Sequence, residues 1–256
     1  MSNLPGFPQF DTTNQAPSRK QREIADRHNL FLSIARKLVH EKGFHQLSMD
    51  VVAEQAEYSK GTLYQHFSCK EEILIQICNH TILVLHSLGQ RAATYPGTHR
   101  ERLLAFAVAH ELWLELEPAD IYMMQNVHTD GVLDKASEQS LETHNKLQNG
   151  ILQLVAGIIQ EAINDGDLPA GRINAAELVY GLWSMTYGGQ LLRSYQIPLK
   201  EMGVLDPGGT ITTLIQATLD GLGWKPSMSV EATSTLLVEL QTNFFKADIE
   251  TLRLNR

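Results

Sequence analysis

Apolar residues recur every three to four positions along most of the chain, and this spacing predicts helices rather than strands. The first apolar stripe lies in residues 19–42 and is followed by Gly43, a residue type that favours the end of a helix. Its members are Ile24, Phe31, Ile34, Ala35 and Leu38. Pro and Gly residues separate the further predicted helices, which are 49–55, 60–66, 70–93, 99–116, 119–128, 134–164, 173–195, 210–222 and 229–252. The expected fold class is therefore all-α.

Composition indicates a globular protein without a membrane span. Hydrophobic residues make up 43% of the chain and charged residues 20%, which is enough apolar surface to close a core. Uninterrupted apolar stretches fall well short of the roughly 18 residues that a membrane helix requires. The first residues also lack the basic start and apolar run of a signal peptide. We therefore expect a cytoplasmic protein.

Charge divides the chain into two parts. Up to Lys70, nine Lys and Arg residues against seven Asp and Glu residues give a charge of +2, whereas the remainder carries −10. A weakly basic start followed by an acidic body favours separate domains. With the helix lengths, it predicts a disordered leader at 1–18, a small three-helix domain at 19–70, a larger helical domain at 71–225 and an appended C-terminal helix within 226–256.

Two short predicted helices, 49–55 and 60–66, are joined by only a few residues, which is the spacing of a helix-turn-helix. Ser48 and Ser59 are suited to cap the two helix starts. Apolar residues on the inner side of the second helix, Leu63 and Phe67, leave its other side polar. That side carries no acid and suits the major groove of DNA. It consists of Lys60, Gly61, Thr62, Tyr64, Gln65 and His66.

This segment resembles the N-terminal domain of the TetR family of bacterial transcriptional repressors. The matching residues are Gly43-Phe44, Leu47-Ser48-Met49, Val52-Ala53, Ala56, Ser59-Lys60-Gly61-Thr62-Leu63-Tyr64, His66-Phe67 and Lys70-Glu71-Glu72. The resemblance implies a ligand-responsive regulator that binds a palindromic operator in double-stranded DNA as a homodimer and is released by a small effector. By position it implies phosphate contacts from Ser48 and Ser59, proximity to base edges for Lys60, Gly61, Thr62 and Gln65, and DNA-backbone contacts from Tyr64, His66 and Lys70.

The sequence departs from the family pattern at two positions. Glu57 stands where a helix-turn-helix usually has a turn glycine, and a left-handed conformation there would cost about 1–2 kcal/mol, so we expect a distorted turn. Cys69 stands where the family usually has a polar cap, and we expect Ser68 and Glu71 to form a capping box instead. Next to Lys70 and a helix start, Cys69 also suggests a redox switch, against the simpler interpretation of a cysteine that fills a cap position.

The resemblance further implies that the second domain binds a small ligand between its helices and that the long helix 70–93 transmits the change. Aromatic and thioether side chains suited to an apolar or aromatic effector are candidates for this site, although ordinary core is the favoured interpretation of each one taken alone. They are Trp113, Tyr122, Met123, Met124, Trp183, Met185 and Tyr187. Polar contacts could come from His86, His110, Gln125 or His128.

The helices 173–195 and 210–222 are the expected dimer surface, with monomer core as the alternative for their apolar positions. Those positions are Leu178, Gly181, Leu182, Met185, Leu191, Leu192, Leu214, Leu219 and Leu222. The ten histidines show no metal-ligand spacing, so we expect no metal and no cofactor. A catalytic constellation is also lacking, and we expect no enzyme. The alternative functions are a helical small-molecule-binding or interaction protein without DNA binding and, more remotely, a helical enzyme.

Overall fold

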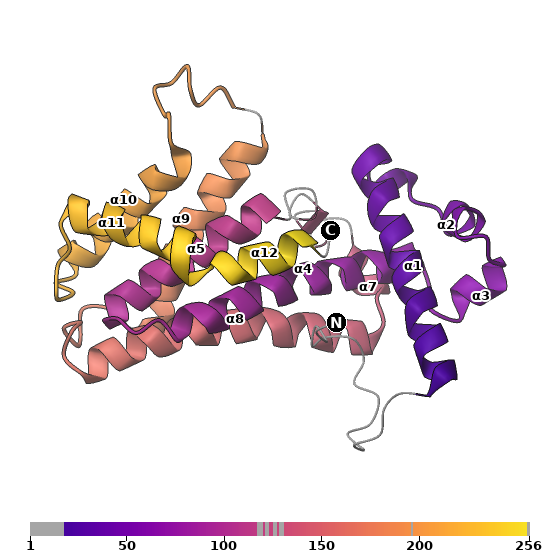
Figure 1. Ribbon diagram of the computed structural model, residues 1–256, viewed down its shortest axis with the longest axis horizontal. Helices are drawn as coiled ribbons and strands as arrows, with labels where there is room; N and C mark the ends of the chain where they lie inside the picture. The colour runs from indigo at the N-terminus through magenta and orange to yellow at the C-terminus, as the bar shows by residue number, and fades with distance from the viewer. Residues whose placement is uncertain are drawn as a thin grey trace. The chain divides into compact units, whose positions relative to one another are not determined.

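The structure is helical wherever it describes regular secondary structure (Figure 1). The computed structural model describes residues 18–116, 120, 123–124, 127, 131–195 and 197–254. Its elements in chain order are α1 (Arg19–Lys42), the 3-10 turn η1 (Phe44–Gln46), α2 (Met49–Gln55), α3 (Lys60–Tyr64), α4 (Lys70–Ala93), α5 (His99–Leu116), α7 (Val132–Lys135), α8 (Glu138–Asn164), α9 (Ala175–Ser194), α10 (Pro207–Gly221), α11 (Val230–Glu239), the π-helical turn η2 (Leu240–Phe244) and α12 (Lys246–Leu254). No strand occurs in these ranges, so the predicted all-α fold class is confirmed.

Most helix boundaries lie within two or three residues of the predicted ones, and two helices are interrupted where one continuous helix was expected. Within 134–164, the hydroxyl of Ser137 accepts a hydrogen bond from the backbone N–H of Ser140 at 3.2 Å and starts α8 anew. Within 229–252, the N–H of Phe245 donates to the carbonyl of Leu240 at 2.9 Å, five residues back, and inserts a π turn. The predicted helix 119–128 lies partly outside the described residues.

The chain forms two compact units, and the first combines two separate segments. The first unit consists of residues 1–84 and 117–147, and the second of residues 85–116 and 148–256, described over the ranges given above. The expected domain boundary at Lys70 stays a prediction, but it differs from this division. The sequence does not reveal that residues 117–147 belong to the first unit, because residues 85–116 of the second unit separate them from residues 1–84.

The core of the first unit joins α1, α2 and α3 to the start of α4 and to the segment after α5. Phe31, Leu63 and Phe67 are at most 1% exposed, as are Ile73, Leu74 and Ile77 of α4. Met123, Val127 and Val132 complete the same cluster. The helix-turn-helix therefore depends on residues beyond position 70 for its packing.

A buried carboxylate fixes α1 to α4 and to the 117–147 segment within the first unit. Asp120 is 1% exposed and forms an ion pair with Arg36 Nη2 at 3.0 Å. It also accepts hydrogen bonds from His40 Nε2 at 2.9 Å and Thr81 Oγ1 at 2.8 Å. A second carboxylate, Glu72 of α4, accepts from both the backbone N–H and the hydroxyl of Ser137. These contacts hold the 117–147 segment in place from two sides.

The second unit packs α5, α8, α9 and α10 around a separate apolar core. Ile159, Leu168, Leu219 and Trp224 have no exposed surface. The fully buried Arg100 of α5 donates to carbonyl and carboxylate oxygens of α10 and the turn after it. Its partners include Gln216 Oε1 at 2.8 Å and Asp220 Oδ1 at 2.7 Å.

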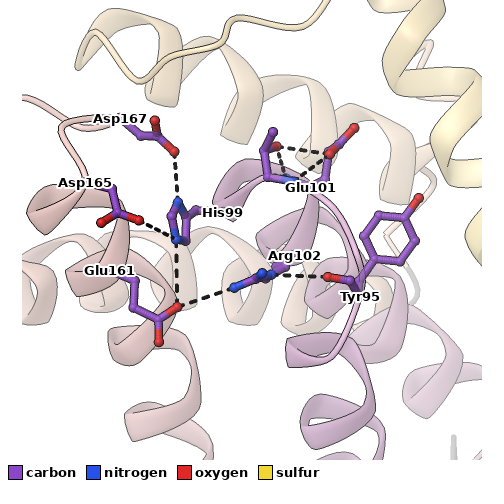
Figure 2. A network of polar contacts seen from close by, with 8 residues as sticks. Tyr95, His99, Glu101, Arg102, Glu161, Asp165 and Asp167 are labelled. Atoms are coloured by element: carbon purple, nitrogen blue, oxygen red, sulfur yellow. Dashed lines mark hydrogen bonds and ion pairs between the residues drawn. The ribbon is translucent and has the colours of Figure 1, made fainter.

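A polar network fastens the first turn of α5 to the end of α8 (Figure 2). His99 Nδ1 lies 2.8 Å from Asp167 Oδ2, and its Nε2 lies 3.5 Å from Asp165 and 3.8 Å from Glu161. Arg102 adds an ion pair to Glu161 at 3.4 Å. Among the described residues no group of His, Cys, Asp and Glu side chains has the arrangement of a metal site, so we interpret this network as structural.

The C-terminal segment covers α5 rather than standing apart from the second unit. The elements α11, η2 and α12 all contact α5, and Leu240 and Phe245 have no exposed surface. The guanidinium of Arg91 lies 4.2 Å from the ring centroid of Phe244 and pairs with Asp248 at 3.8 Å. Of the helices described, none is long and apolar enough to cross a membrane.

Candidate nucleic-acid interface

Side-chain caps start both helices of the helix-turn-helix, as the sequence predicts. Ser48 Oγ accepts from the N–H of Asp50 at 3.2 Å and begins α2. Ser59 Oγ accepts from the N–H of Thr62 at 3.1 Å and lies 2.8 Å from the Thr62 hydroxyl. Both serines are engaged within the protein through one oxygen each, and a hydroxyl can still make a further hydrogen bond to phosphate.

The turn between α2 and α3 is regular, although it contains Glu57 in place of glycine. Glu57 has a φ of +59°, and among the described residues it is the one non-glycine residue with positive φ. Its N–H donates to the Glu54 carbonyl at 3.1 Å, and the N–H of Tyr58 donates to the Ala53 carbonyl at 3.0 Å. These two bonds are the pair of a Schellman motif. The expected distortion is therefore absent, and the cost remains as local strain in Glu57.

The outer side of α3 is open to solvent while its inner side is buried. Tyr64 is 53% exposed, and Lys60, Gly61 and Gln65 are exposed beside it. A Cβ added at Gly61 would meet only the Ser59 hydroxyl, at 3.8 Å. Packing inside the protein thus does not require a glycine at 61, and the bare backbone leaves room for an approaching partner.

Lys60 forms an ion pair across the helix-turn-helix. Its Nζ lies 2.6 Å from Asp50 Oδ2, and both side chains are about 60% exposed. Asp50 lies in the first turn of α2, and its pairing with Lys60 depends on the angle between the two helices. Sequence reasoning therefore did not identify Asp50 as part of the site.

His66 and Lys70 are less free than the other predicted contact residues. The His66 ring is half-buried, with its centroid 5.3 Å from that of Phe31. Burial, together with the nearby Arg27, lowers the pKa of His66, so the imidazole is neutral near pH 7. The Lys70 ammonium lies 4.7 Å from the ring centroid of Phe44. DNA contacts by these two residues stay predictions.

The start of α4 is held by side chains of the 117–147 segment. Instead of the expected capping box with Ser68, Glu71 accepts from Lys135 Nζ at 3.0 Å. Burial raises the pKa of Glu72, but hydrogen bonds from Ser140 and Ser137 outweigh it and leave that pKa below its usual value. Cys69 Sγ donates to the Lys135 carbonyl at 3.4 Å. An anionic Glu72 thus anchors the start of α8 to α4.

The predicted effector residues are divided between the two units. Met123 is 2% exposed in the core of the first unit, and Met124 packs against that core. Trp113 is 4% exposed in the second unit, with its ring centroid 5.5 Å from that of His110, and Met185 packs against the second core. Tyr122, Gln125 and His128 lie outside the described residues.

Two of these residues, Trp183 and Tyr187, are on the surface of α9. They are 52% and 41% exposed, with ring centroids 6.3 Å apart. The six predicted residues that the structure describes therefore do not gather around one site within either unit, and the effector site stays a prediction.

Comparison with known proteins identifies the family. The profile described as "Bacterial regulatory proteins, tetR family" matches residues 31–77, which contain the second half of α1, all of α2 and α3, and the start of α4. The chain is 26% identical over 185 residues to the HTH-type transcriptional activator FasR of Mycolicibacterium smegmatis, covering 64% of this chain and 83% of that protein. Residues 31–77 thus carry the helix-turn-helix domain of the TetR family. The chain is accordingly a DNA-binding transcriptional regulator.

Further TetR-type relatives are similarly distant. The HTH-type transcriptional regulator QacR of Staphylococcus aureus is 26% identical over 162 residues, covering 61% of this chain and 84% of QacR. The fatty acid metabolism regulator protein of Bacillus subtilis is 23% identical over 140 residues, covering 55% and 70%.

The fold is also that of solved TetR-family structures. PfmR of Thermus thermophilus superposes with a TM-score of 0.57 at 23% identity, covering 75% of this chain and 98% of PfmR. The fatty acid degradation regulator FadR of Bacillus halodurans gives a TM-score of 0.57 at 16% identity, covering 76% and 99%. At these identities the solved structures support the shared fold.

Proposed function

We propose that this TetR-family regulator is a repressor that binds a palindromic operator as a homodimer and is released by a small apolar or aromatic effector. The observation that carries the proposal is the geometry of α3. Leu63 and Phe67 are buried, while Lys60, Tyr64 and Gln65 stand exposed on the outer side. This side can reach phosphates and base edges together in a major groove. Operator binding requires access to the chromosome, so we also propose a cytoplasmic location.

For the homodimer we propose the outer faces of α9 and α10. Of the predicted apolar positions, Leu178, Leu182 and Leu219 are buried in the second unit's own core. Two other predicted positions, Leu192 and Leu214, are 47% and 50% exposed, and α9 adds the exposed aromatic residues Tyr180 at 71%, Trp183 at 52% and Tyr187 at 41%. Large exposed apolar patches of this kind mark partner surfaces.

Dimerisation also compensates for the weak charge of each DNA-binding segment. Non-specific affinity grows with the number of phosphates neutralised, and one segment carries only +2 up to Lys70. A two-fold dimer would present two copies of α3 about 34 Å apart, which is one turn of B-DNA.

For the effector we propose an apolar compound, with a fatty-acyl chain as the first class to test. Two relatives described above are named as fatty acid regulators, of metabolism and of degradation. In the second unit, Trp113 and Met185 stay candidates for lining the site, whereas Trp183 and Tyr187 suit the dimer surface better. His110 Nδ1 is buried without a hydrogen-bond partner, so it is the candidate polar contact.

Operator binding is tested by fluorescence anisotropy with duplexes from the DNA upstream of the coding sequence, over a series of salt concentrations. We expect Tyr64→Ala to weaken specific binding at least tenfold, since it removes a proposed DNA contact of α3 in each protomer. Val230→Ala, at an exposed position of α11 in the second unit, is the control and should have little effect. Absence of specific binding under all conditions would contradict the proposal.

Effector release is tested by a thermal-shift screen of fatty acids, acyl thioesters and aromatic compounds. A compound that raises the melting temperature should also lower DNA affinity, because coupling between two binding sites is reciprocal. Compounds that stabilise the protein without changing its DNA affinity would count against induction.

A further inference from the structure

The helix-turn-helix has an unusual charge balance for a DNA-binding element. Residues 48–67 contain a single lysine and no arginine, against the three acids Asp50, Glu54 and Glu57. Non-specific affinity for DNA comes from Lys and Arg side chains that neutralise phosphates and release counterions. The state of Lys60 therefore largely decides how strongly this element is attracted to DNA of any sequence.

In the free protein, Lys60 must break an ion pair before it can contact DNA. Its ammonium lies 2.6 Å from Asp50 Oδ2, an ion pair between the starts of α3 and α2. Both positions are fixed by the backbone, because Asp50 lies in the first turn after the cap Ser48 and Lys60 directly follows the cap Ser59. The partial positive charge at the start of α2 also stabilises the Asp50 carboxylate where it stands.

A phosphate can take Lys60 only by displacing Asp50. One ion pair is then exchanged for another, and the released carboxylate remains close to the negative DNA backbone, so the net gain is small. At a matching base sequence, further contacts from the outer side of α3 are formed at the same time. Those contacts can offset the exchange, for example when Lys60 reaches the O6 and N7 acceptors of guanine.

We propose that Asp50 is a positioning residue, which holds Lys60 in the free protein and thereby lowers affinity for DNA of any sequence. This inference rests on the proposed DNA contacts of α3. Asp50 acts on DNA binding through Lys60, and its removal should strengthen binding rather than weaken it.

The test compares full-length wild type with Asp50→Asn by fluorescence anisotropy between 50 and 200 mM KCl. The probes are a random-sequence 30-base-pair duplex and a duplex from the upstream region. For the random duplex we expect Asp50→Asn to bind roughly two- to fivefold more tightly per protomer, the range expected for loss of one exposed ion pair. The slope of log affinity against log salt should steepen by about 0.9 per released lysine. Affinity for the upstream duplex should rise by a similar factor, because the free energy of breaking the ion pair is the same for both duplexes.

Two matched variants separate the ion pair from general charge. Glu54→Gln removes the same charge from an exposed position of α2 that does not hold Lys60, and it should leave the salt slope unchanged. In a Lys60→Gln background, Asp50→Asn should no longer steepen the slope or tighten binding to the random duplex. Circular dichroism melting curves of all variants establish that each is folded.

Several results would overturn the inference. An equal effect of Glu54→Gln, or a full effect of Asp50→Asn in the Lys60→Gln background, would assign the change to net charge alone. If wild type prefers the upstream duplex and Asp50→Asn leaves the random duplex unaffected, the inference fails while the proposed function stands. If wild type binds neither duplex even at 50 mM KCl, both fail together.

Discussion

Replacing Glu57 with glycine should stabilise the protein, because this residue carries local backbone strain in the turn of the helix-turn-helix. Its φ is +59°, where a side chain costs about 1–2 kcal/mol relative to glycine. Glycine also raises the conformational entropy of the unfolded chain, which lowers the free energy of unfolding by about 0.4–1 kcal/mol. The net expectation for Glu57→Gly is a gain of about 0.5–1 kcal/mol in the free energy of unfolding. For a chain of this size, that corresponds to about 1–4 °C in melting temperature.

The assay is urea denaturation together with scanning calorimetry, and two variants serve as controls. Glu57→Gln removes the charge but keeps a side chain in the left-handed conformation, so it should stay within about 0.5 kcal/mol of wild type. Glu54→Gly places glycine inside α2 and should destabilise by about 0.5–1 kcal/mol. The strain argument is refuted if Glu57→Gly lowers stability as Glu54→Gly does, or if it gains no more than Glu57→Gln.

Three further predictions concern buried groups. Burial lowers the pKa of His110 to about 4, so the imidazole stays neutral in the folded protein. The free energy of unfolding should therefore be highest above about pH 6.5 and fall by up to about 3 kcal/mol as the pH decreases towards 4. In urea titrations at pH 7.5 and 5, His110→Phe should reduce this loss. Asp120→Ala removes the buried carboxylate that Arg36, His40 and Thr81 share and should cost about 1.5–3 kcal/mol. Asp134→Ala at an exposed position should change the free energy of unfolding by less than about 0.5 kcal/mol in chemical denaturation. Thiol titration of the native protein should label the half-buried Cys69 and not Cys78, whose pKa burial raises, and labelling of both at equal rates would contradict the packing of α4.

Local signals in the sequence predicted the helix-turn-helix well because its structure is set by neighbouring residues. A serine oxygen caps the N–H groups two or three residues later, so the starts at Ser48 and Ser59 follow from a few residues. The inward residues Leu63 and Phe67 follow from the helical period in the same way. The family resemblance added which side faces DNA.

Long-range contacts and the effector site could not be predicted by the same reasoning. Asp120 pairs with His40 across 80 positions of sequence, and neither residue carries a local signal of that pairing. Met123 has the side chain of a ligand-contacting residue, but it lies in the core of the first unit. A thioether packs equally well against protein or ligand, so residue type alone cannot distinguish the two roles.

The composite first unit limits how this protein can be taken apart or recombined. A fragment that ends near Lys70 would contain all of the helix-turn-helix but would lack Ile73, Leu74 and Ile77, and with them Met123 and Val132 of its core. Exchange of sensory domains between such regulators would have to keep residues 117–147 with the DNA-reading part, although 32 residues of the other unit precede them. The functional modules of this chain are therefore interleaved in its gene, and a hybrid regulator built with a single junction would break both.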